Sequence, residues 1–169
     1  LSEGTLLSLN LSSEKTPAAP GAGTPEARLT VMQWARRLRP RFQGGLLGLI
    51  RGEGGDRGIH ALIEVANRME AVATTAPVYQ LWWVTGALLD ALRADGLEAS
   101  VTVKRLLGHA DRELKRLYTD GEQSYASAPP IELLNNLLFY VARSTASGVR
   151  IDAVKSSFRL GELLPVDES

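Results

Sequence analysis

Apolar residues recur every three or four positions along much of the chain, and the longest regular run lies at 100–118. This spacing places the apolar residues of the run on one face of a helix of about 3.6 residues per turn. They are Val103, Leu106, Leu107, Ala110, Leu114 and Leu117. Ser100 is a suitable N-cap and Gly121 a suitable stop. The sequence therefore predicts an amphipathic helix with a buried apolar face and a charged, mainly basic remainder.

The same period predicts the other helices of the chain. They are expected over 24–38, with a weaker continuation at 42–50, and over 56–69, 77–95, 131–146 and 151–160. Pro40 is expected to kink or break the first of them. No segment alternates apolar and polar residues between hairpin turns, so strands are expected to be absent or marginal. The predicted fold class is all-α, an antiparallel bundle of about six helices joined by short connections.

The composition changes along the chain and divides it into three parts. Residues 1–25 combine a short leucine-containing arm with a linker rich in proline, glycine and small polar residues. Residues 26–160 hold the helical patterns and are predicted to form the bundle domain. Residues 161–169 form an acidic tail. Because the chain begins at Leu1 without an initiator methionine, we expect it to be a piece of a longer protein.

One aromatic residue does not follow the apolar stripe of its helix. In the 77–95 helix, Leu81, Trp82 and Leu88 belong to the stripe, whereas Trp83 projects to the other side. A tryptophan in that position indicates either a second layer of helices or a surface for a partner. The sequence favours neither alternative.

Charge and composition exclude several classes of function. The 169 residues include 19 basic and 19 acidic side chains, so the net charge of zero does not fit a domain-wide nucleic-acid footprint. The absence of cysteine and the presence of two histidines exclude thiol nucleophiles and His-rich metal sites, and no cofactor is indicated. No apolar run is long enough to cross a bilayer and no signal peptide opens the chain. We therefore expect a soluble, cytoplasmic protein without membrane insertion.

The two histidines are the remaining candidates for chemistry. Phosphotransfer needs an exposed imidazole, a cation near the phosphoryl group and room for a partner domain. Histidine phosphotransfer modules meet these needs with the pattern His-x-x-Lys-Gly. His109 is followed by Arg112 in the lysine position but by Glu113 where glycine would leave room, and the motif of His60 has no cation. Acid pairs such as Asp111 with Glu113 are expected to be solvated surface charges.

Three helical blocks carry a resemblance to a known family. They are RPRFQGGLLGLIRGE (39–53), LWWVTGALLDAL (81–92) and VKRLLGHADRELKRL (103–117). They resemble the FimL family and the matching N-terminal part of the ChpA/PilL chemosensory kinases, over roughly residues 28–160. The resemblance implies a phosphotransfer-like helical bundle in the system that controls type IV pili, twitching motility and cyclic-AMP signalling. It also implies a scaffold, because the phosphorylatable histidine is often missing from such bundles.

Two functional hypotheses follow. The first is a non-catalytic interaction module whose protein partner is a response regulator or a scaffold of the pilus system. Its partner surface is predicted at Trp83 or at the basic flank of the helix that carries His109, with Arg105, Arg112 and Arg116. The second is an active histidine phosphotransfer domain that uses His109.

Overall fold

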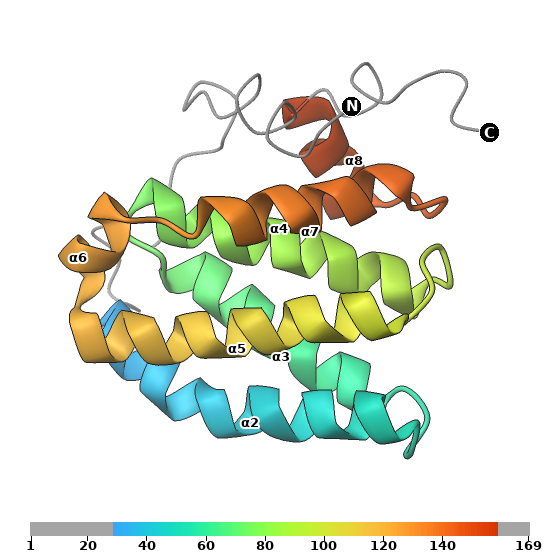
Figure 1. Cartoon of the computed structure of the whole chain (residues 1–169), viewed down its shortest axis with the longest axis horizontal. Helices are drawn as coiled ribbons and strands as arrows, with labels where there is room; N and C mark the ends of the chain where they lie inside the picture. The colour runs from blue at the N-terminus through green and yellow to red at the C-terminus, as the bar shows by residue number, and fades with distance from the viewer. Residues whose placement is uncertain (1–28, 159–169) are drawn as a thin grey trace.

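The computed structural model describes residues 29–158, and these form seven helices without a strand (Figure 1). The helices are α2 (Val31–Arg51), α3 (Arg57–Val72), α4 (Ala76–Arg93), α5 (Val101–Asp120), α6 (Glu122–Ser127), α7 (Ile131–Arg143) and α8 (Val149–Ser157). The predicted all-α bundle is confirmed. The sequence pattern did not indicate the short helix α6, which has only one buried residue, Tyr125.

Local capping explains where α2 begins. The side-chain oxygen of Thr30 accepts from the backbone N–H of Gln33 at 3.1 Å, and the backbone N–H of Thr30 donates to Gln33 Oε1 at 2.8 Å. This reciprocal capping box satisfies two backbone donors that the first turn would leave unpaired. Residue 24, where this helix was expected to begin, lies outside the described residues, and Leu29 precedes the helix instead of belonging to it.

Pro40 does not break the helix: α2 is continuous from Val31 to Arg51 with Pro40 inside it. The predicted break was therefore wrong. Ala35 and Phe42, on either side of the proline, are both fully buried in the same core. Tertiary packing of this apolar face outweighs the hydrogen bond that proline removes.

One glycine of α2, Gly45, has a packing role together with Gly58 of α3. A Cβ atom added at Gly45 would lie 2.8 Å from the carbonyl oxygen of Gly58, and one added at Gly58 would lie 2.6 Å from that of Gly45. The backbones of α2 and α3 therefore approach more closely than any larger residue allows at these two positions.

The helices pack around α4. Helices α3, α7 and α8 all contact it, while α2 packs on α3 and α5 (Figure 1). The predicted stripe of α4 is buried, and so are the residues on its other sides, because neighbours cover it on several faces. The predicted core stripe of α5 is also fully confirmed. No helix within residues 29–158 is both long enough and apolar enough to cross a bilayer.

A half-buried arginine attaches α8 to this core. Arg150 donates to both carboxylate oxygens of Asp90, at 2.8 and 3.0 Å, to Glu70 at 3.2 Å and to the side-chain oxygen of Asn67 at 2.7 Å. Gly86 leaves room for the guanidinium, since a Cβ there would lie 2.5 Å from it. Burial raises the pKa of Glu70, although the positive charge of Arg150 opposes this shift.

Candidate functional site

The candidate site is the outer face of α5, and the caps of this helix fix its position. The Ser100 hydroxyl accepts from the backbone N–H of Val103 at 3.2 Å, and the backbone N–H of Gly121 donates to the carbonyl of Leu117 at 3.1 Å. Both predicted helix ends are therefore confirmed. Since the apolar stripe faces inward, the basic residues of α5 lie on its flanks and on its outer face.

One flank of α5 is attached to α2 by Asp111. Arg39 donates from Nε and Nη2 to the two oxygens of this carboxylate, each at 3.1 Å, and Gln43 donates to it at 3.4 Å. Asp111 is only 8% exposed, so the expectation of a solvated surface acid was wrong. Sequence spacing could not show this contact, because both donors come from another helix.

The same arginine extends the attachment toward the C-terminal end of α5. Arg39 Nη1 donates to the hydroxyl of Tyr118 at 3.2 Å, and the guanidinium of Arg36 lies 4.5 Å from the centre of the Tyr118 ring. The hydrogen bonds to Asp111 and to Tyr118 raise the pKa of Arg39 above its usual value. These charges hold two helices together and are not free for a partner.

Arg116, one of the predicted partner-binding residues, is also engaged within the fold. It forms an ion pair with Glu113 at 2.9 Å, donates to the backbone carbonyl of Ala128 at 2.9 Å and lies 4.4 Å from the centre of the Tyr125 ring. Burial lowers the pKa of Arg116, but the hydrogen bond to Glu113 and the negative charges around the guanidinium together outweigh burial and raise the pKa. The side chain attaches the α6 region to α5, so it does not serve as a free surface cation.

Trp83 is not a surface anchor either. Its side chain is 4% exposed, it stacks on Tyr79 with ring centres 6.0 Å apart, and it lies 6.4 Å from the ring of Phe158 at the end of α8. Of the two alternatives for Trp83, the second layer of helices is the one found in the fold. The prediction of a partner contact at Trp83 was wrong because α8 covers it.

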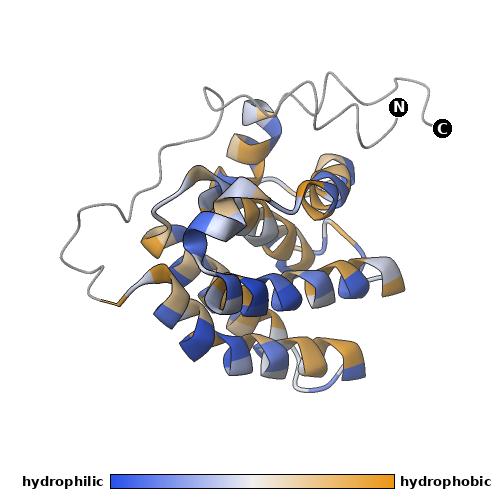
Figure 2. Cartoon of the chain, turned by 60° about the vertical axis from the view of Figure 1, so that its left-hand side comes forward, coloured by the Kyte–Doolittle hydropathy of each residue, from blue (hydrophilic) through white to orange (hydrophobic). Residues whose placement is uncertain are grey.

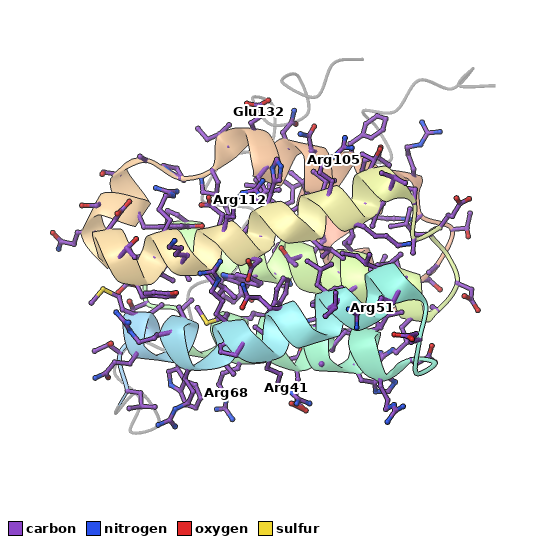
Figure 3. All side chains as sticks on the ribbon, turned by 60° about the horizontal axis from the view of Figure 1, so that its bottom comes forward. Arg41, Arg51, Arg68, Arg105, Arg112 and Glu132 are labelled. Atoms are coloured by element: carbon purple, nitrogen blue, oxygen red, sulfur yellow. The ribbon has the colours of Figure 1, made fainter. Side chains whose placement is uncertain are left out.

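Arg105 and Arg112 remain exposed on the outer face of α5. Within residues 29–158 neither guanidinium has an ion pair, a hydrogen bond from its side chain or an aromatic ring beneath it. The two residues lie about two helical turns apart, which places them on the same side of the helix, as Figure 3 shows. Arg41 and Arg68 lie on the opposite side of the molecule in that view.

The histidines differ in their surroundings. His109 is half-buried on α5, one turn before the exposed Arg112, and Glu113 at the position of the motif's glycine is paired with Arg116. His60 is exposed on α3 and lines a shallow hollow with Arg41 and Arg57, two cations that its sequence motif did not show. Arg41, however, is paired with Glu64 at 2.6 Å.

In the described part of the chain, no three histidine or carboxylate side chains lie close enough together to bind a metal ion. The outer face of α5 presents two unpaired guanidinium groups in a fixed relation, beside a half-buried imidazole, and such groups are suited to bind an acidic surface.

Comparison with known proteins gives one family. The family model described as the second domain of the FimL scaffold protein matches residues 29–169. The Scaffold protein FimL of Pseudomonas aeruginosa is 30% identical over 129 residues, which cover 76% of this chain and 22% of that protein. The chain thus spans less than a quarter of the length of this curated relative. No solved structure matches the chain.

Proposed function

This chain belongs to the FimL scaffold protein family, and we propose that it acts as a non-catalytic, protein-binding module of a type IV pilus chemosensory system. In this role it holds a signalling partner and turns over no substrate. The expected partner is a response regulator or another scaffold of the pilus system, the expected location is the cytoplasm, and the expected cellular output is twitching motility.

The observation that carries the proposal is the contrast among the arginines of α5 and its neighbours. Arg39, Arg116 and Arg150 each pair with a carboxylate inside the fold. Arg105 and Arg112 pair with nothing among residues 29–158, and both are exposed. Unpaired guanidinium groups on a rigid helix are suited to steer and bind an acidic partner, and arginine is enriched among residues that dominate binding energy.

The test reverses the charge of this face. In the full-length scaffold, Arg105→Glu combined with Arg112→Glu is expected to abolish binding to the purified receiver domain of the pilus response regulator and to reduce twitching. A control makes the same charge change on α3, with Arg57→Glu and Arg68→Glu, and should leave both readouts unchanged. Arg68 lies 4.6 Å from the centre of the Trp34 ring, so thermal melting must verify that this variant is folded. Equal loss in the two double variants would contradict a specific surface on α5.

The active phosphotransfer alternative is favoured by one observation, the exposed Arg112 one turn after His109. It predicts acid-labile phosphate on the protein after incubation with a cognate kinase, and loss of that label in His109→Gln. The scaffold proposal predicts no such label, and normal partner binding and motility in the His109→Gln variant. A folded His109→Gln protein that lost motility would establish the alternative instead.

A further inference from the structure

Exposed apolar side chains gather at one end of the α2/α5 pair. Among residues 29–158, five large hydrophobic side chains are exposed, and three of them belong to these two helices: Leu47 at 46%, Ile50 at 51% and Val101 at 71%. Figure 2 shows hydrophobic colour at the end of α2 and at the start of α5, which lie at the same end of the molecule. We call these three residues with Arg51, Lys104 and Arg105 the open end.

The register of the two helices places these residues together. Arg36 lies against Tyr118, and both Arg39 and Gln43 contact Asp111, so α2 and α5 run antiparallel. Ile50 lies about two turns after Gln43 on α2, and Lys104 lies about two turns before Asp111 on α5. Ile50 and Leu47 therefore lie opposite the segment 101–108.

The helical residues of the open end carry charges of one sign. These residues are Arg51, Lys104 and Arg105, and α2 as a whole contains arginines but no acidic residue; the exposed acids Glu53 and Glu98 lie in the loops beyond the two helix ends. No ion pair involves these three cations within the described residues. Apolar side chains bordered by unpaired cations form a surface whose complement is apolar and acidic.

We propose that the open end binds an amphipathic, acidic α-helix of a partner protein. The helix would set its apolar residues on Leu47, Ile50 and Val101 and its carboxylates on the flanking cations. This inference rests on the proposed function, because it names the kind of partner segment that the α5 surface recognises.

The geometry of α5 favours a helix as the ligand. Arg105 and Arg112 lie about two turns apart, the spacing at which a second helix repeats its side chains along one face. Gly108 lies between them, and a Cβ added there would meet no atom within 4 Å. The missing side chain allows another backbone to approach α5 at this point.

An anionic membrane is the other surface that apolar and basic residues can recognise. One feature favours the protein helix: the outward position of Gly108 offers an indentation for a ridge of side chains, which a lipid surface does not present.

The experiment uses the full chain and a labelled synthetic helix with leucines along one face and glutamates on both flanks, followed by fluorescence anisotropy. We expect saturable binding that weakens with salt, and little binding of the same peptide with lysines in place of the glutamates. Leu47→Asp with Ile50→Asp should weaken binding by about tenfold or more. Val149→Asp is the matched control, since Val149 is 93% exposed on α8, and should not change binding.

Each outcome has a fixed meaning. Equal loss in Val149→Asp, or equal binding of the lysine peptide, would overturn the proposal. Binding to phosphatidylglycerol vesicles without binding to the acidic helix would overturn it in favour of a membrane. If Leu47→Asp with Ile50→Asp leaves peptide binding unchanged while Arg105→Glu with Arg112→Glu abolishes receiver-domain binding, this inference fails and the proposed function stands. Thermal melting by circular dichroism verifies that each variant is folded.

Discussion

The two halves of the α2/α5 pair use similar residues in opposite ways. In one half, Arg36 and Arg39 hold Tyr118 and Asp111, and the two helices are joined by hydrogen bonds and an ion pair. In the other half, the open end, Leu47 and Ile50 are about half exposed and the cations have no partner among residues 29–158. We call the first half the tied half.

This difference shows that a basic helix face cannot be assigned to partner binding from its charge alone. Arginines of the tied half are held by buried or half-buried partners, so removing one leaves a carboxylate without its hydrogen bonds. Arginines of the open end and of the outer face of α5 contribute little to folding, because they remain in water. These exposed arginines can therefore bind a partner without breaking an interaction that stabilises the fold.

The largest effect is expected from the core that both halves share. Leu114 is fully buried beneath the tied half, so Leu114→Ala removes apolar contacts and leaves a cavity. We expect the free energy of unfolding to fall by about 2–5 kcal/mol, and by a similar amount for Leu106→Ala. Urea denaturation followed by circular dichroism measures it. A loss below 1 kcal/mol would show that this helix packs more loosely than its burial indicates.

A somewhat smaller effect is expected from the link between the helices. Asp111→Ala leaves the guanidinium of Arg39 half-buried without its carboxylate, and we expect a loss of about 2–3 kcal/mol. Replacing both partners, with Arg39→Met and Asp111→Leu, should cost clearly less than the sum of the single changes. Strict additivity in this double-mutant cycle would mean that the pair does not join α2 to α5.

Much of the fold could be predicted from the sequence because helical periodicity reports burial directly. The apolar stripe of α5, its cap at Ser100 and its stop at Gly121 all agree with the structure. The continuity of α2 through Pro40 could not be predicted, since it depends on Phe42 and Ala35 packing against helices far along the chain. Local propensity describes one helix, whereas this outcome is decided between helices.

The candidate site was harder to predict, for a related reason. Arg105 and Arg112 were identified as basic residues off the apolar stripe, and they are exposed. Arg116 fitted the same description but is paired with Glu113. Trp83 was also predicted to project off the stripe of its helix, but Phe158 packs against it. A sequence gives the direction in which a side chain leaves its own helix but not what another helix places there.

Changes at the open end test the opposite half of the comparison. Ile50→Ser removes an apolar side chain that is already 51% exposed, so we expect it to lower the free energy of unfolding by about 1 kcal/mol or less. The same urea titration measures this change. A loss as large as that of Leu114→Ala would mean that Ile50 belongs to the core and not to a binding surface.

The smallest effect is expected from Arg112→Ala. Arg112 has no partner among residues 29–158, so its removal should change the free energy of unfolding by about 0.5 kcal/mol or less. Arg116→Ala is the informative control, because it is four residues away on the same helix but loses an ion pair with Glu113 and the contact with Tyr125. It should therefore be clearly more destabilising. If the two variants were equally stable, the distinction between arginines that serve the fold and arginines that are free to bind would not hold on α5.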